Sequence, residues 1–324
     1  MDKKLNLPLY PEHELTLQAM ASWPATRHVF EPDHIAALRA AEASGRPLLV
    51  RGEPGTGKSQ LAHAAAQAAG RLFLPFVVET RTEATDLLWH YDAVARLADA
   101  HLAAAPGAGV PAGLDASFYV QTGPLWWAFH WQGAQDQLAK ASRTRAAAPE
   151  LPPYDWQAGQ GTVLLIDEID KAEAEVPHGL LEALGNGRFA VPLVRDVVRR
   201  PDAMPAPLVI ITTNDERELP AAFLRRCLVL TLALPQGAAL ADFLVTRGRL
   251  HFPVFAAQVA ATQVLEQAAQ MLLDDRQDAH DNGVYEPGLA EYLDLIRALQ
   301  GVQGDPVKHL QQLRRFAFQK QPLR

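Results

Sequence analysis

The sequence predicts an α/β fold: a five-stranded parallel β-sheet followed by a C-terminal all-helical domain. Three observations support this prediction. Short apolar runs alternate with helical segments, which is typical of a parallel sheet covered on both faces. A glycine-rich loop lies between the first apolar run and the next helix, as in phosphate-binding loops. Beyond residue 235 the apolar runs stop and helical periodicity continues.

The predicted elements follow in order along the chain. A helix is expected over residues 27–44 with Asp33 as its cap, and a second over residues 61–69, ending at Gly70. Strands are expected where short apolar runs end at polar or turn residues. These runs are residues 47–50, 72–78, 162–166, 208–211 and 228–232.

Two domains are expected in a chain of 324 residues. Residues 1–235 would form the α/β domain and residues 236–324 a helical domain. Lys58 and Asp167 are 109 residues apart in the sequence, which is more than one helix, one strand and another helix need. The segment 89–160 is therefore expected to be an insertion. The helical domain shows an apolar stripe at helical spacing: Leu289, Tyr292, Leu293, Ile296 and Leu299. The Gly/Pro-rich stretches 103–113 and 141–161 are expected to be loops.

Composition and charge narrow the class of protein. The formal net charge of −7 disfavours non-specific binding of nucleic acid as the main activity. Residues 308–324 are basic, and either a solvated helix face or a nucleic-acid contact would explain them. No apolar stretch is long enough to span a membrane, and no signal peptide is evident. The single cysteine, Cys227, excludes internal disulfides and predicts a packing residue in a reducing, cytoplasmic compartment.

Residues 52–59, with the sequence GEPGTGKS, match the phosphate-loop pattern G-x-x-x-x-G-K-[ST]. Small residues allow backbone N–H groups to converge on phosphates at the positive end of a helix. Lys58 is expected to reach the β- and γ-phosphates, and Ser59 to bind Mg²⁺. The expected ligand is Mg-ATP, although no residue identifies the base and GTP remains open. The expected nucleotide-binding residues are Gly52, Pro54, Gly55, Thr56, Gly57, Lys58, Ser59 and Gln60.

Asp167 and Glu168 end the apolar run of residues 163–166. Buried carboxylates are costly unless a cation meets them, and nucleotide-bound Mg²⁺ is the natural counter-ion. We expect Asp167 to bind the metal together with Ser59, and Glu168 to orient or deprotonate the attacking water.

Polar residues also follow the next predicted strand. Asn214 comes directly after residues 211–213 and could hydrogen-bond to the γ-phosphate and the water, or simply begin a turn. Arg225 and Arg226 end a short helix, where they could reach the nucleotide of a neighbouring subunit or be surface cations at a helix C-terminus.

These motifs, in this order, resemble those of AAA+ ATPases. The matching segments are 45–59 (GRPLLVRGEPGTGKS), 163–172 (VLLIDEIDKA), 211–214 (ITTN) and 218–227 (ELPAAFLRRC). Residues 118–125 (FYVQTGPL) resemble the Gly-Pro hairpin that MoxR-like AAA+ proteins insert near their second conserved helix. The resemblance covers about residues 27–300 and is specific because four motifs occur in the family order.

The resemblance implies a fold, the P-loop NTPase fold with an AAA+ core, and also a mechanism. Asn214 would be the sensor 1 residue, Arg226 or Arg225 the arginine finger, and residues 236–324 the lid. The chain would form a homo-oligomeric ring, with a hexamer as the expected form, that hydrolyses ATP to remodel a protein client such as one with a von Willebrand A domain.

One departure from the MoxR-like pattern leaves a second hypothesis open. Such lids usually carry a basic sensor 2 residue where this chain has Glu286, between Tyr285 and Pro287. A glutamate there would repel phosphate, so a slowly hydrolysing, nucleotide-gated scaffold is the alternative, and a nucleic-acid motor is a weaker one. Aromatic residues crowd the insertion and would form either a contact surface or a small separate core: Trp126, Trp127, Phe129 and Trp131.

Overall fold

The computed structural model describes residues 14–20, 22–103, 115–257, 261–302 and 306–319. These residues form two compact units. Unit 1 comprises the chain up to residue 51 together with residues 59–230, and unit 2 comprises residues 52–58 together with the chain from residue 231. The domain boundary at residues 235–236 stays a prediction.

Unit 1 is built on a five-stranded parallel sheet with the strand order β11–β3–β10–β7–β4, which confirms the predicted fold class. The strands are β3 (Leu48–Gly52), β4 (Leu72–Val77), β7 (Thr162–Asp167), β10 (Leu208–Thr213) and β11 (Leu228–Leu232). In the register of β10, Ile211 lies beside Ile166 of β7 and Thr212 beside Val50 of β3. The carboxyl ends of β3, β7 and β10 therefore meet at one edge of the sheet.

Strand β4 forms one border of the sheet and contains Pro75. The N–H groups of Leu72 and Val78 both donate to residues of the β7 side, at 3.2 and 2.9 Å. Because alternate residues of a strand direct their N–H groups to opposite sides, the nitrogen of Pro75 faces away from β7. A proline fits here without costing the sheet a hydrogen bond.

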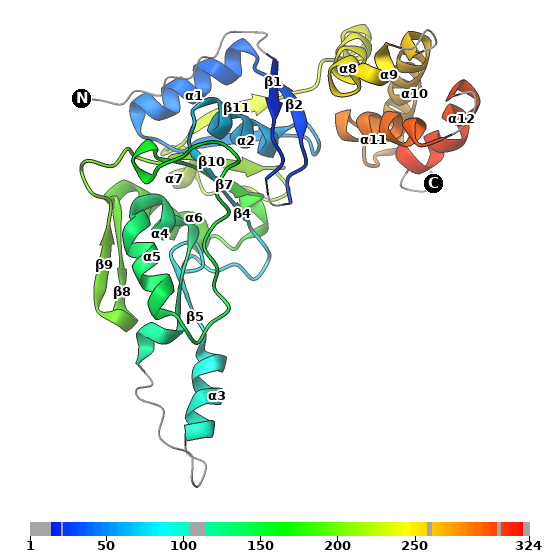
Figure 1. Cartoon of the computed structure of the whole chain (residues 1–324). Coiled ribbons are helices and arrows are strands. Elements are labelled where there is room, and N and C mark those ends of the chain that lie inside the picture. Colours follow the sequence, from blue (N-terminus) through cyan, green and yellow to red (C-terminus); the bar gives the residue numbers. More distant parts are fainter. Residues whose placement is uncertain (1–13, 21, 104–114, 258–260, 303–305, 320–324) are drawn as a thin grey trace. The chain divides into compact units, whose positions relative to one another are not determined.

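Helices cover both faces of the sheet, with α1 and α2 on one side and α4, α5 and α6 on the other (Figure 1). Their bounds are α1 (Pro32–Ser44), α2 (Lys58–Ala68), α4 (Pro124–Phe129), α5 (Trp131–Lys140) and α6 (Glu175–Asn186). Side chains of alternate strand residues, such as Leu74, Leu164 and Ile211, join one buried core with α4 and α6. The strands are consequently apolar on both faces, as a buried parallel sheet requires.

The helix predicted over residues 27–44 is wrong in its first part. Thr26–Val29 forms strand β2, which pairs with β1 (Glu14–Leu17) in an antiparallel ladder. Helix α1 begins only at Pro32, where proline favours the first helical position, and its N-cap is Glu31 rather than Asp33. The ladder is tied to α2 by Gln67, whose side chain donates to the carbonyl of Thr16 at 2.7 Å.

The insertion contains strands β5 (Trp89–Tyr91) and β6 (Val120–Thr122), which pair with each other, and helix α3 (Ala93–Ala103), which projects from unit 1 (Figure 1). The aromatic residues of α4 are buried, and they belong to the same core as the central sheet rather than to a separate one. Most of the loop predicted at residues 103–113 lies outside the described residues. Residues 141–157 form no helix or strand, as predicted, and a short 3₁₀ turn follows at Ala158–Gln160.

A further antiparallel hairpin that was not predicted, β8 (Arg188–Val191) with β9 (Asp196–Arg199), lies between α6 and β10. Its strands have four residues each, which is too short for a periodic signal, and β9 begins with two exposed residues, Asp196 and Val197. After β10, the short helix α7 (Ala221–Leu224) leads to Arg225, Arg226 and the buried Cys227. Cys227 packs in the core, as predicted.

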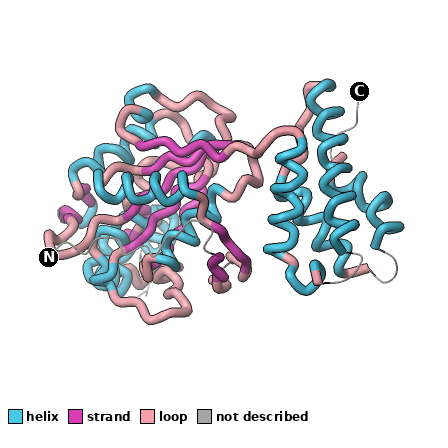
Figure 2. The backbone as a smooth tube through the Cα atoms, turned by 90° about the horizontal axis from the view of Figure 1, so that it is seen from above, coloured by secondary structure: helices cyan, strands magenta, loops and turns pink. Residues whose placement is uncertain are grey.

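From Ala238 onward, the described residues of unit 2 form helices and no strands (Figure 2). The helices are α8 (Ala238–His251), α9 (Pro253–Ala256), α10 (Ala261–Asn282), α11 (Leu289–Gln300) and α12 (Pro306–Ala317). The predicted apolar stripe lies on α11, where four of its residues are buried and Leu293 is half-buried. None of the helices in the described ranges combines the length and apolar character that crossing a bilayer demands.

A buried polar contact joins α10 to α12. Asp275 is 6% exposed and accepts hydrogen bonds from Arg314 at 2.6 Å and Gln319 at 2.8 Å. Part of the basic segment 308–324 therefore stabilises unit 2 internally, while Arg315 is exposed.

Candidate nucleotide site

The phosphate loop connects β3 to the first turn of α2, the strand–loop–helix order that the motif requires. Gly52, Gly55 and Gly57 have positive φ angles of 150°, 76° and 93°. Side chains other than hydrogen are disfavoured at such angles, so the glycines allow the loop to curl. The ammonium of Lys58 donates to the carbonyls of Gly52 at 2.7 Å and Glu53 at 2.9 Å.

Within unit 2, the loop packs closely against α11 and the last residue of β11. A Cβ atom on Gly55 would lie 2.6 Å from the Cβ of Ala290 in α11, and one on Gly52 would lie 2.2 Å from the carbonyl oxygen of Leu232. Both distances are shorter than van der Waals contact. Two of the motif glycines are therefore required by space as well as by backbone conformation.

Arg276 of α10 links the loop to the segment in which a basic residue was expected. One of its terminal nitrogens contacts both carboxylate oxygens of Glu53, at 2.8 and 2.9 Å, and lies 3.0 Å from Glu286. His280 lies 2.9 Å from the other oxygen of Glu286. Glu286 thus faces a cation in this structure, rather than standing as an unpaired negative charge.

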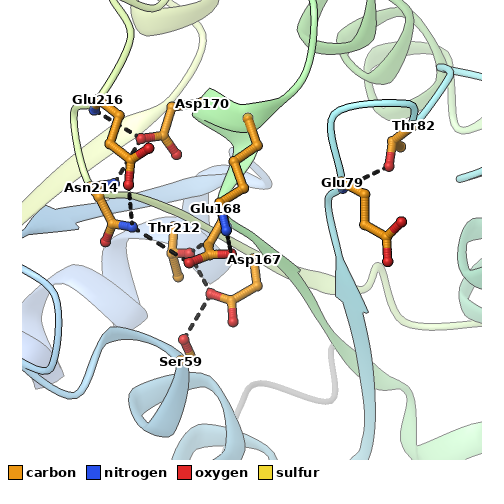
Figure 3. A network of polar contacts seen from close by, with 10 residues as sticks. Ser59, Glu79, Thr82, Asp167, Glu168, Asp170, Thr212, Asn214 and Glu216 are labelled. Atoms are coloured by element: carbon orange, nitrogen blue, oxygen red, sulfur yellow. Dashed lines mark hydrogen bonds and ion pairs between the residues drawn. The ribbon is translucent and has the colours of Figure 1, made fainter. Parts of the chain in front are cut away.

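The two predicted carboxylates lie at the carboxyl end of β7 (Figure 3). Asp167 Oδ1 accepts a hydrogen bond from the Ser59 hydroxyl at 2.7 Å and another from the Thr212 hydroxyl at 2.5 Å. Ser59 follows Lys58 in the first turn of α2, and Thr212 lies on β10. The structure therefore brings the two predicted metal-binding residues together.

Glu168 follows Asp167 in a left-handed conformation, with φ = 60°, and its N–H donates to the Thr212 hydroxyl at 2.9 Å. This backbone conformation is rare for residues other than glycine. One Glu168 oxygen lies 2.5 Å from the ammonium of Lys171, and the other lies 3.5 Å from the Asn214 amide nitrogen. The hydrogen bond with Glu168 raises the pKa of Lys171 above its usual value, so this lysine is charged at neutral pH.

The donor set fits Mg²⁺, which prefers oxygen ligands and is usually bound by one or two protein groups together with phosphates and water. The Ser59 hydroxyl and the Asp167 carboxylate are such a pair, already within hydrogen-bond distance. Among the residues that the structure describes, no group of three His, Cys, Asp or Glu side chains could hold a metal alone.

The other predicted site residues, apart from the two arginines, lie close to the carboxylates or in and beside the phosphate loop. Asn214 lies beside Glu168, as the strand order suggested, and also lies 3.5 Å from Glu216. Gln60 directs its side chain to the carbonyl of Arg27 in β2 at 3.0 Å. Pro54 and Thr56 lie in the loop, where the Thr56 hydroxyl donates to the carbonyl of Glu53.

Arg225 and Arg226 are exposed at the end of α7. Within the described ranges, neither guanidinium contacts Asp167, Glu168 or Asn214. The backbone carbonyl of Arg225 accepts a hydrogen bond from Arg46 at 3.0 Å.

Sequence reasoning missed three residues of this network: Thr212, Asp170 and Lys171. Each lies within four residues of a predicted site residue, so the local sequence contained a signal. Thr212 and Asp170 are buried polar residues in apolar surroundings, a combination that usually indicates a defined hydrogen-bond partner.

Comparison with known proteins places this chain in a family. The model of the AAA domain of the dynein-related subfamily matches residues 47–227. No curated protein matches the sequence. A solved structure of a variant of RuvB from Thermotoga maritima is 15% identical over 82% of this chain and 59% of that chain, with a TM-score of 0.41. The chain thus spans less than two thirds of that protein.

The matched residues make up more than half of the chain and contain the phosphate loop, Asp167, Glu168, Asn214 and both arginines. The chain therefore belongs to the family of AAA domains of the dynein-related subfamily, and so to the AAA+ ATPases.

Proposed function

We propose that this protein is a MoxR-type AAA+ ATPase that hydrolyses Mg-ATP to remodel or assemble a partner protein. The main support is that four predicted residues lie close together in the structure. Ser59 of α2 contacts Asp167 at the end of β7, and Glu168 after β7 lies beside Asn214 after β10. A metal-binding hydroxyl, a metal-binding carboxylate, a general base and a polar amide are the groups that ATP hydrolysis needs.

In the proposed mechanism, Lys58 exchanges its bonds to the loop carbonyls for contacts with the β- and γ-phosphates. Ser59 and Asp167 would hold Mg²⁺, which would neutralise part of the phosphate charge. Asn214 orients the attacking water and Glu168 accepts a proton from it as the water oxygen bonds to the γ-phosphorus. The bond from the γ-phosphorus to the β–γ bridging oxygen breaks, so that ADP and inorganic phosphate are the products. The proton would go to Oε1 of Glu168, the oxygen beside the Asn214 amide, because Oε2 contacts the Lys171 ammonium.

Oligomerisation is also proposed. Arg226, or Arg225 beside it, would complete the site of a neighbouring subunit and neutralise charge in the transition state. The exposure of both side chains supports a role between subunits. The ring would be a cytoplasmic homo-oligomer, most simply a hexamer, and its client a protein such as one with a von Willebrand A domain.

Steady-state phosphate release from Mg-ATP tests the enzymatic part of this proposal. Glu168→Gln is expected to bind Mg-ATP with unchanged affinity, but to lose at least about 100-fold in kcat because glutamine cannot accept the proton. Glu173→Gln, an exposed carboxylate paired with Arg217, is the matched control and should retain wild-type activity. Equal turnover of wild type and Glu168→Gln would exclude Glu168 from the mechanism.

A nucleotide-gated scaffold with slow turnover is the second candidate. The specific observation in its favour is Arg276, whose guanidinium is occupied by Glu53 and Glu286. Residues 284–291 contain no cation that could approach phosphate in its place. Assembly with Mg-ATP, observed by light scattering without phosphate release, would favour the scaffold, whereas rapid turnover of the isolated chain would exclude it.

A further inference from the structure

Asp170 is a buried carboxyl group close to the proposed site, but it has no role in the mechanism above. It lies in the 3₁₀ turn Ile169–Lys171, directly after Glu168, and is 2% exposed. Its Oδ2 atom accepts the N–H of Asn214 at 3.1 Å and the N–H of Glu216 at 3.0 Å (Figure 3). A single oxygen therefore holds two backbone donors of the turn that carries Asn214.

The turn that carries Asn214 contains a strained backbone conformation, which hydrogen bonds to the turn help to stabilise. Asp215, between the two donors, has a positive φ of 58°, a conformation that costs free energy for a residue other than glycine. The N–H of Asp215 donates to the Thr213 hydroxyl at 3.0 Å. All three N–H groups of the turn are thus bonded to side-chain oxygens, and two of them depend on Asp170.

The second oxygen, Oδ1, is buried and has no hydrogen-bond partner among the described residues. A buried carboxyl group with one unused oxygen is unfavourable by itself, so the two bonds through Oδ2 are its main compensation. This arrangement does not resemble a ligand site. It is a connection between the Glu168 segment and the Asn214 turn.

The connection matters because the Asn214 amide lies 3.5 Å from Glu168, at the limit of hydrogen-bond length. A shift of a few tenths of an ångström in the turn would make or break this contact. We propose that Asp170 is a positioning residue, which holds the Asn214 turn so that its amide and the Glu168 carboxylate address the same water. This inference rests on the proposed ATP hydrolysis and extends it by one residue.

A double-mutant cycle on the full chain tests the positioning role. Asp170→Leu replaces the carboxyl group with an apolar side chain of similar size, and Asp170→Asn keeps an oxygen that can accept both N–H groups. Asn214→Ala removes the amide on which Asp170 is proposed to act. For each variant, kcat and KM for Mg-ATP are measured together with thermal unfolding, and Asp170→Ala replaces Asp170→Leu if the leucine variant does not fold.

Asp170→Leu is expected to lower kcat on the order of 10- to 100-fold, as for misplaced catalytic groups, with KM changed by less than about threefold. Asp170→Asn should restore kcat to within about threefold of wild type. In the Asn214→Ala background, Asp170→Leu should lower kcat by less than about twofold further, because the group it positions is already absent.

Two results would overturn the inference, and they differ in whether they also contradict the proposed function. If the wild-type chain hydrolyses ATP and the effects of Asp170→Leu and Asn214→Ala on kcat multiply, Asp170 does not act through Asn214, and the proposed function stands. If the wild-type chain hydrolyses no ATP, the proposed function fails and the positioning role fails with it.

Discussion

The single hydroxyl of Thr212 forms hydrogen bonds with two site residues, the side chain of Asp167 and the backbone of Glu168. It is fully buried, donates to Asp167 and accepts the N–H of Glu168. Thr212→Val keeps the shape and removes both hydrogen bonds. We expect a loss of about 1–3 kcal/mol in the free energy of unfolding, because the Glu168 N–H is left without an acceptor. Urea denaturation measures this loss.

Thr162 provides the matched control for that substitution. It lies on β7 and is also buried, but its hydroxyl has no hydrogen-bond partner among the residues described. Thr162→Val should leave the free energy of unfolding within about 0.5 kcal/mol of wild type or raise it. A loss equal to that of Thr212→Val would show that threonine burial alone, and not the network, determines the result.

The burial of the Cys227 thiol predicts that the stability of the fold depends on pH. Burial raises the pKa of its thiol to about 11, from an ordinary value of 9.0. Between these values the folded chain keeps a proton that the unfolded chain releases, so the free energy of unfolding falls as pH rises from about 9 towards 11. Below pH 9 both states are protonated and this contribution is fully present.

Denaturation from pH 8 to 10.5 checks the prediction, with Cys227→Ala as the reference. The stability of wild type should fall more steeply than that of Cys227→Ala, since other groups titrate equally in both proteins. Parallel profiles would contradict the burial of the thiol.

At the residue scale, the sequence predicted the groups that lie at strand ends and missed those that act across strands. Asp167, Glu168 and Asn214 each follow an apolar run, and parallel strands place such ends together. The roles of Thr212 and Asp170 depend on the register of β10 against β7 and on the path of one turn. Neither follows from spacing along a single segment.

At the element scale, the phosphate loop allows a sharp test of its glycines. Gly55→Ala would place a methyl group 2.6 Å from Ala290 at a φ of 76°. We expect at least about tenfold weaker binding of Mg-ATP, because the loop must change its path to relieve the contact and the strained backbone angle. Isothermal titration calorimetry measures the affinity.

Gly185, in the last turn of α6, is the control for the glycine test. It has an ordinary helical conformation, and a Cβ would meet nothing within 4 Å. Gly185→Ala should leave nucleotide binding unchanged and raise the free energy of unfolding by up to about 1 kcal/mol. Unchanged affinity in Gly55→Ala would refute the steric argument.

Element prediction succeeded for long or strongly apolar segments and failed for short ones. All five strands of the central sheet were predicted, because buried parallel strands form continuous apolar runs. The sequence predicts a helix over β2 as an extension of the helical spacing of residues 35, 38 and 41 in α1. The pairing partner that makes it a strand, β1, lies about ten residues earlier in the chain.

At the scale of the whole molecule, a ring with shared sites predicts complementation between inactive subunits. Arg226→Ala keeps its own Glu168 but gives no arginine to its neighbour, and Glu168→Gln does the reverse. Each variant alone should be nearly inactive. A mixture should regain activity, because sites that combine Glu168 from one subunit with Arg226 from another are complete.

Phosphate release from mixtures at several ratios is the measurement, and the peak should lie at an intermediate ratio. A mixture of Glu168→Gln with Lys58→Ala is the control, since both lesions disable the subunit's own nucleotide site. Activity of Arg226→Ala alone at the wild-type level would exclude Arg226, and Arg225→Ala would then be tested in its place.

The proline in β4 has a consequence for solubility. The border strand of an open sheet can recruit a strand from another molecule through its unused donors and acceptors. On β4 the outward position midway along the strand is Pro75, which offers no donor, although the neighbouring Val77 is 54% exposed and apolar. The ring nitrogen of Pro75 therefore removes one of the outward donors that an added strand would need, without removing a hydrogen bond from the native sheet.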